Sequence, residues 1–248
     1  MKSRFENPFY WVRFGAAIVY FIVMCFVNLL VFLASLFNHR AVCNCMRWEA
    51  VGLLALLGIR VRIMENMFPG TPGKKTNFLF ISNHQSMLDI LVILSLVPVP
   101  LSFIAKKELF WAPFLNVHLW LAGCLSIDRN SLKRSYRDIK RAVDVLKRKR
   151  SLIMFPEGTR QTEDRIGPFK AGFLKLAQEA GVSVVPIVMR GTGKVMKKKS
   201  MKMDTRAAIE VSIAAPIPSS SLKGAQSAEE IRKLFIRTYE KMRVQSPR

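Results

Sequence analysis

Residues 77–89 read Asn-Phe-Leu-Phe-Ile-Ser-Asn-His-Gln-Ser-Met-Leu-Asp, and the other predicted elements are arranged around this stretch. The short run of large apolar residues at 78–81 predicts a buried strand, and the apolar residues at 87–97 predict a helix that follows it. His84 therefore lies in a loop at the carboxyl end of a strand. Open α/β sheets hold their ligands at that edge.

His84 has a candidate partner five residues further on, at Asp89. A neutral histidine that is oriented by a carboxylate can take a proton from a hydroxyl group near neutral pH. Residues five apart in an ideal helix point about 140° away from each other, so the two side chains can meet only if His84 precedes the helix. A turn histidine that bonds only to the backbone is the alternative.

Two later stretches add similar chemistry: Gly123-Cys-Leu-Ser-Ile-Asp-Arg129 and Phe155-Pro-Glu-Gly-Thr-Arg160. Together with Asn83-His84 and Asp89, in this order, they resemble the glycerolipid acyltransferases, and more narrowly the 1-acylglycerol-3-phosphate acyltransferases. The resemblance covers about residues 77–214. It implies acyl transfer from a thioester of coenzyme A or acyl carrier protein, which no spacing in the sequence reveals.

The composition limits the class of protein. The chain has 248 residues, with 39 Lys and Arg against 17 Asp and Glu, which gives a net charge of +22. Such an excess calls for a polyanionic partner, either nucleic acid or anionic lipid headgroups. The hydrophobic fraction of 50% argues against a simple nucleic-acid binder. Four cysteines show neither metal-ligand spacing nor a disulfide framework, so we expect reduced thiols in a protein that faces the cytosol.

The N-terminal part indicates a membrane anchor. Residues 14–37 are 24 uncharged residues, long enough to cross a bilayer of about 30 Å, and aromatic residues at 9–11 suit its interface. The run is too long for the core of a signal peptide, which has about 7–15 residues. A second, less apolar segment at 39–60 either follows the spanning helix or returns beside it as a hairpin in one leaflet. The flanking charges leave the orientation open.

We therefore expect an α-helical anchor at 1–60, a linker rich in proline and glycine at 61–76, and a catalytic domain at 77–248. The expected fold class is α/β, with a mixed sheet flanked by helices. Strands are predicted at 101–105, 124–127, 151–155, 182–189 and 206–213, and helices at 131–150 and 171–180. Pro186 makes the strand at 182–189 an edge strand or a bulged one.

All three motif blocks follow candidate strands, so one edge of the sheet gathers several cationic side chains beside His84. Lys106 is either a point charge for a phosphate or a solvated lysine, and Arg129 is either a planar phosphate ligand or part of an ion pair. Gly158 lets the backbone approach a ligand closely, in a turn with Thr159, and Arg160 adds a second planar donor. Glu157 either binds a glycerol hydroxyl or holds an arginine. His118 matches no motif and is interpreted as structural.

With the donor that the resemblance implies, His84 would deprotonate the sn-2 hydroxyl of lysophosphatidate as it attacks the thioester. Lys106, Arg129 and Arg160 would hold the phosphate, and the product would be phosphatidate. A backbone amide near His84 or Gly158 would stabilise the oxyanion. We expect no metal and no cofactor, and we place the active site at the cytoplasmic face of a membrane, the inner membrane in a bacterium.

Two alternatives stay open at this point. In the first alternative, the protein acylates another lysolipid or glycerol 3-phosphate. In the second, the protein is a membrane-anchored basic protein that binds anionic lipid or nucleic acid, although we expect no nucleic acid as a partner.

Overall fold

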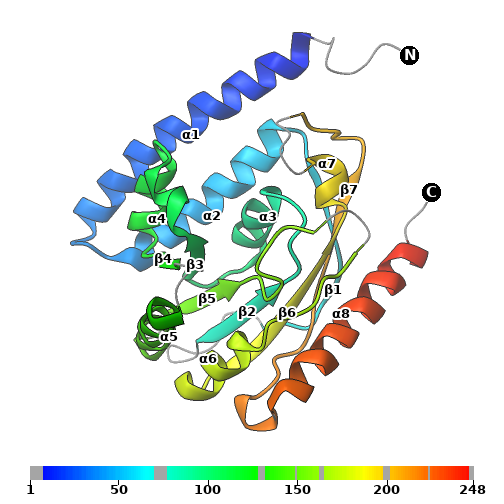
Figure 1. Ribbon diagram of the computed structural model, residues 1–248. Helices are drawn as coiled ribbons and strands as arrows, with labels where there is room; N and C mark the ends of the chain where they lie inside the picture. Colours follow the sequence, from blue (N-terminus) through cyan, green and yellow to red (C-terminus); the bar gives the residue numbers. More distant parts are fainter. Residues whose placement is uncertain are drawn as a thin grey trace.

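The computed structural model describes residues 8–69, 77–127, 132–148, 150–161, 165–197, 202–222 and 224–245. Within these residues, one mixed seven-stranded sheet runs in the order β1-β7-β6-β2-β5-β3-β4 (Figure 1). The strands are β1 Arg60–Asn66, β2 Phe78–Ser82, β3 Leu101–Lys106, β4 Leu125–Ile127, β5 Ser151–Met154, β6 Ser183–Arg190 and β7 Ala208–Ile213. The helices are α1 Pro8–Ala34, α2 His39–Leu56, α3 Leu88–Leu96, α4 Leu115–Leu121, α5 Leu132–Lys147, α6 Gly172–Ala180, α7 Thr192–Val195 and α8 Gly224–Gln245, with 3₁₀ turns η2 Lys107–Trp111 and η3 Ser219–Ser221.

Both faces of the sheet are covered by helices, which is why the central strand β2 is almost entirely apolar and fully buried. Phe78 and Phe80 of β2 pack with α3 on one face, whereas Leu79 and Ile81 pack with α5, α6 and α8 on the other. Successive side chains of a strand point to opposite faces, so a continuous apolar run serves both cores. Figure 1 shows α1 to α4 on one side and α5, α6 and α8 on the other. The expected α/β class with a mixed, helix-flanked sheet is confirmed.

The N-terminal 60 residues are not a separate unit. Helix α1 is long and apolar enough to cross a membrane by length and composition, and it lies along α2 and α4. Helix α2, in contrast, covers the sheet: Leu54 is in the same core cluster as Phe80 and Val92. The second segment of the expected anchor therefore belongs to the layer of helices above the sheet.

The structure corrects two further expectations. Residues 61–66 are not linker, because β1 pairs with β7 in parallel; residues 70–76 lie outside the described residues. β6 is an interior strand despite Pro186, with β2 on one side and β7 on the other. Its carbonyl accepts from Ala214 N–H, and the regular ladder with β7 starts only at Ile187. Pairing resumes at Val184 and Ile217, with one residue more in the neighbouring chain than in β6 between this pair and Ile187–Ile213. The edge alternative is therefore wrong, whereas an irregular, bulged pairing does lie beside Pro186.

The strands that precede the three sequence motifs share one direction. β2 pairs in parallel with β5 and β6, and β3 pairs in parallel with β5 and β4. The carboxyl ends of these strands therefore meet at one edge of the sheet, as expected, and the loops that leave this edge build the candidate site.

Candidate active site

His84 and Asp89 form a short hydrogen bond at this edge. Nδ1 of His84 lies 2.7 Å from Oδ2 of Asp89, whose side chain is fully buried, whereas the imidazole is 18% exposed. Asp89 is in the first turn of α3, and His84 precedes that helix. The structure therefore confirms that His84 lies in the loop before the helix and that its side chain meets that of Asp89. The role of the pair in a reaction stays a prediction.

The carboxylate of Asp89 also holds the loop in shape. Its Oδ2 accepts the backbone N–H of Gln85 at 2.8 Å and that of Ser86 at 3.0 Å. Charge-assisted bonds of this kind are stronger than bonds between neutral groups. One buried oxygen therefore orients the imidazole and the backbone beside it together.

Three side chains next to His84 anchor the loop to distant parts of the fold. Asn83 bonds in both directions to the backbone of Met189 in β6, with its amide donating at 2.8 Å and its oxygen accepting at 2.8 Å. Ser86 donates to the carbonyl of Met196, and Gln85 donates to the hydroxyl of Tyr239 in α8. Sequence reasoning did not assign these roles. The position of Asn83 beside His84 is a usable signal, whereas no pattern links Gln85 with Tyr239.

The loop after β5 lies directly against His84. The ring of Phe155 stacks on the imidazole with 4.0 Å between centroids and 16° between planes. The N–H of Gln161 donates to the carbonyl of His84 at 2.7 Å. Gly158, with φ of +71°, allows the turn between these residues. The two loops are thus one assembly, although the sequence separates them by about 70 residues.

Glu157 lies beneath this assembly and faces the interior. Its side chain is 4% exposed, and neither carboxylate oxygen accepts a hydrogen bond of good geometry from the described residues. Burial raises the pKa of this carboxyl to about 8, although the backbone N–H groups of Gly167 and His84 act to lower it. Glu157 therefore carries a proton for much of the time at neutral pH, and no described arginine pairs with it.

The structure describes two of the three proposed phosphate ligands, Lys106 and Arg160. Lys106 ends β3 at this edge, with its ammonium group 3.5 Å from Glu108 and its side chain 59% exposed. Arg160 is half-buried and Thr159 is exposed, both in the loop that is bonded to His84. Arg129 lies outside the described residues. The site therefore combines a histidine with two cations on its surrounding loops.

The sequence comparisons bear on the same segments. The family model named Acyltransferase matches residues 58–190, which include β1 to β6 and all three motif blocks. A 1-acyl-sn-glycerol-3-phosphate acyltransferase of Salmonella typhimurium is 32% identical over 185 residues, which are 74% of this chain and 74% of that protein. The chain belongs to the 1-acylglycerol-3-phosphate acyltransferase family.

Plant members of the acyltransferase family are similar over a smaller share of their own length. The chloroplastic 1-acyl-sn-glycerol-3-phosphate acyltransferase LPAT1 of Arabidopsis thaliana is 31% identical over 225 residues, 89% of this chain and 61% of that protein. A relative from Limnanthes douglasii is 36% identical over 149 residues, 60% of this chain and 51% of that protein. The chain thus spans about half to three fifths of these plant relatives.

The fold of the acyltransferase family is also known from a crystal structure. The 1-acyl-sn-glycerophosphate (LPA) acyltransferase PlsC from Thermotoga maritima matches with a TM-score of 0.80, over 96% of this chain and 99% of that chain. The two sequences are 22% identical. This likeness supports the fold, including the arrangement of α1 and α2 with the sheet.

Proposed function

We propose that this protein transfers a fatty acyl group from an acyl thioester to the sn-2 hydroxyl of lysophosphatidate, which yields phosphatidate. Its family membership supports this reaction, since the relatives above are named for it. The acyl donor is acyl-CoA or an acyl carrier protein thioester. Acylation of another lysolipid or of glycerol 3-phosphate is the alternative within the same chemistry.

The observation that carries the proposal is the contact between His84 and Asp89. An ionised carboxylate can only accept hydrogen bonds, so the Nδ1 that lies 2.7 Å from it carries the proton. The other ring nitrogen, Nε2, then has its lone pair available as a general base. It removes the proton of the acceptor hydroxyl as the oxygen attacks the thioester carbonyl. When the tetrahedral intermediate collapses, its C–S bond breaks, and the imidazolium returns the proton to the departing thiolate of the donor.

The cations at the same edge suit a phosphate-bearing acceptor. Arg160 presents a planar fork that matches phosphate oxygens, and Lys106 adds a point charge. Arg129 follows β4 in the sequence and would extend the same set. Because the three come from different strand ends, the phosphate would be held from several sides while the hydroxyl reaches His84.

An oxyanion donor among the backbone amides near His84 or Gly158 stays a prediction, and three of these amides are already hydrogen-bonded. The N–H groups of Gln85 and Ser86 donate to Asp89, and that of Gly158 donates to the carbonyl of Phe155 at 3.0 Å. These groups are already engaged in holding the loops. They therefore act on the reaction by positioning His84.

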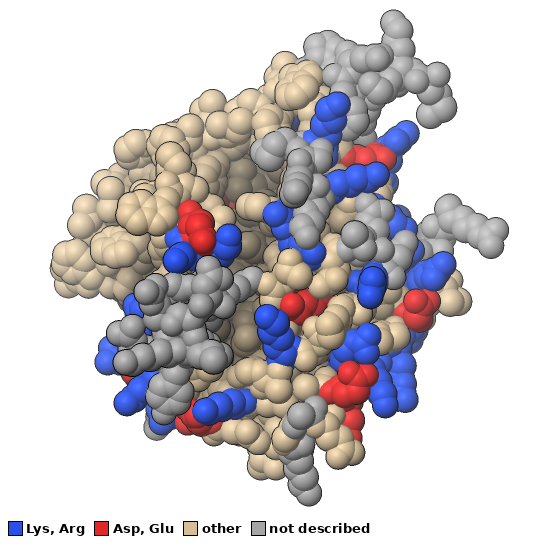
Figure 2. Space-filling view, in the orientation of Figure 1, with Lys and Arg blue, Asp and Glu red and all other residues tan. Residues whose placement is uncertain are grey.

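The proposed place of work is the surface of a membrane, with the site towards the cytoplasm. One side of α1 is apolar and exposed, and Trp48 of α2, Trp111 of η2 and Trp120 of α4 are at least 60% exposed. Figure 2 shows this side of the molecule largely without charge, whereas lysine and arginine are spread over the rest of the visible face. Such a division suits an apolar anchor and an anionic leaflet.

The test is turnover by purified full-length protein in mixed micelles. Both donor types are offered with lysophosphatidate, other lysophospholipids and glycerol 3-phosphate. His84→Ala should lower turnover about 10²–10⁴-fold, since the proton transfer is lost. His39→Ala is the matched control, because His39 bonds to the carbonyl of Leu121, away from the His84 loop. Full turnover by His84→Ala would refute the mechanism. A preference for glycerol 3-phosphate would refute lysophosphatidate as the acceptor.

A further inference from the structure

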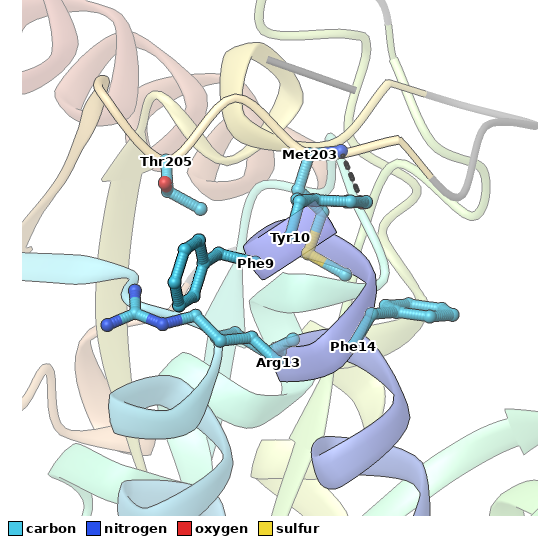
Figure 3. Close-up of a pocket in the computed structure, with 7 residues that line it drawn as sticks. Phe9, Tyr10, Arg13, Phe14, Met203 and Thr205 are labelled. Atoms are coloured by element: carbon cyan, nitrogen blue, oxygen red, sulfur yellow. Dashed lines mark hydrogen bonds between the residues drawn. The ribbon is translucent and has the colours of Figure 1, made fainter. Parts of the chain in front are cut away.

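A cavity of about 230 Å³ lies at the N-terminal end of α1 (Figure 3). Phe9, Tyr10 and Arg13 of α1 form one wall, Leu57 after α2 forms another, and Met203 beyond α7 closes it. None of the lining residues belongs to the His84 loop or to the loop after β5. The cavity is therefore separate from the candidate active site.

The walls combine apolar and polar surface, and a polar contact fastens two of them together. The hydroxyl of Tyr10 accepts the backbone N–H of Met203 at 3.2 Å, which fastens α1 to the segment that follows α7. Figure 3 shows the ring of Phe9 and the side chains of Arg13 and Met203 around the same space. An apolar group of a ligand would find aromatic and thioether surface here.

Arg13 is the cation of this cavity. It forms no hydrogen bond or ion pair with any other residue that the structure describes. Its guanidinium lies against Gly58, where φ is +67° and a Cβ atom would come within 2.7 Å of Nη1. The glycine therefore leaves room for the guanidinium at the mouth of the cavity. The planar fork matches phosphate oxygens in particular.

The surroundings add positive charge. Arg60 begins β1 two residues after Gly58, and its guanidinium donates to the carbonyl of Arg206. Thr205, the residue before Arg206, lines the cavity. Lys202 is exposed beside Met203. Arg206 itself is neutralised by Asp204 at 2.8 Å. The balance near the cavity is positive, which favours an anion.

The position along α1 indicates where that anion resides. The apolar helix begins beside the cavity, and Trp11 and Val12 are 54% and 66% exposed there. Aromatic residues at the end of such a helix lie at the level of the lipid headgroups. We propose that the cavity binds an anionic glycerophospholipid of the bilayer, with its phosphate on Arg13 and its acyl-glycerol part against Phe9, Leu57 and Met203. The site rests on the membrane location proposed above and is independent of acyl transfer.

The experiment measures lipid retained by the full-length protein in detergent, without acyl donor. Native mass spectrometry counts phosphatidylglycerol bound during titration, with phosphatidylcholine as the neutral comparison. We expect one phosphatidylglycerol held in preference, and a loss of affinity of about 10–100-fold in Arg13→Gln, the range of a charge-assisted contact. Arg237→Gln, at an exposed position on α8, removes the same charge elsewhere and should retain the lipid.

Two further arms separate the alternatives. Leu57→Trp fills the cavity without a change of charge and should also release the lipid, whereas a lipid attracted by charge alone would stay. Inorganic phosphate at millimolar concentration should not compete, because it lacks the apolar part. Equal retention by Arg13→Gln and Arg237→Gln, or full displacement by phosphate, would overturn the proposal. His84→Ala should retain the lipid, so a failure of the proposed reaction is recognised separately.

Discussion

The imidazole Nε2 of His118 lies 2.8 Å from Oε1 of Glu49, and both side chains are less than 8% exposed. The other oxygen of Glu49 accepts from Asn28 at 2.7 Å, and Nδ1 of His118 lies 3.2 Å from the sulfur of Cys25. Phe21 stacks on the imidazole at 4.5 Å. This polar cluster joins α1, α2 and α4 within an apolar layer, so it specifies how α1 docks on the fold. The structural interpretation of His118 agrees with this packing.

Glu49→Ala should destabilise the protein. Removing one partner of a buried, hydrogen-bonded pair costs about 3–5 kcal/mol, because the remaining polar groups stay buried without a partner. Chemical denaturation in detergent measures the change in the free energy of unfolding. Glu65→Ala is the control, since that side chain is 44% exposed and lies 3.8 Å from Lys241. Equal stabilities of the two variants would contradict a role for the cluster in docking α1.

Asp89→Asn should impair catalysis more than binding. The amide cannot accept from His84, Gln85 and Ser86 with the same charge, so the imidazole loses its orientation and the stabilisation of its protonated form. We expect kcat to fall about 10²–10⁴-fold with KM for lysophosphatidate nearly unchanged. Asp144→Asn on the exposed side of α5 should retain wild-type kcat. A variant that changes KM alone would show that Asp89 acts through substrate binding.

Glu157→Gln should remove a pH dependence of stability. The pKa of this carboxyl is about 8 in the folded protein because of burial, against 4.5 as its ordinary value. Between these pH values the folded state keeps a proton that the unfolded chain releases. The free energy of unfolding therefore falls as pH rises, by up to about 1.4 kcal/mol per pH unit, and levels off above pH 8.

Glutamine has no such proton, so the stability of Glu157→Gln relative to the wild type should increase from pH 5 to pH 8. Urea titrations at several pH values provide the measurement. Glu230→Gln, at an exposed position of α8, should follow the wild-type curve. A constant difference between Glu157→Gln and the wild type would mean that Glu157 is ionised throughout.

Lysines on the exposed side of α1 should weaken membrane attachment. Val19, Phe26 and Leu30 are 61%, 61% and 65% exposed and share one stripe of the helix. Each lysine at the centre of a membrane costs about 2.5–3.5 kcal/mol. We expect the triple variant to leave the membrane fraction in carbonate or high-salt washes. Val244→Lys, at an exposed apolar position of α8, is the control. A triple variant that resists both washes would refute the anchor.

Substitution is preferable to removal of residues 1–60. Leu54 and Ile59 belong to the core beside α3, and Arg60 begins β1. A truncated chain would therefore lose part of its core as well as its anchor, and the result would not report on the membrane alone.

The local pattern of the sequence determined the elements of the site. An apolar run, a polar loop and an apolar helix place His84 before α3, because strand and helix periodicities are set by neighbouring residues. The same reasoning located β3, β5 and the helix α5 within a few residues. The reaction was predicted from the family motifs, because hydrophobic periodicity carries no information about chemistry.

Only the tertiary structure decided how these elements meet. Asn83 bonds to Met189 and Gln161 to His84 because β6, β2 and β5 are adjacent, and strand order is not encoded in any local pattern. Gln85 bonds to Tyr239 because α8 packs on the sheet. The interior position of β6 was missed for the same reason, because a proline removes one hydrogen bond but does not reveal which strands lie beside it. The placement of α2 over the sheet likewise follows from packing between residues distant in sequence, whose burial free energy exists only in the folded chain.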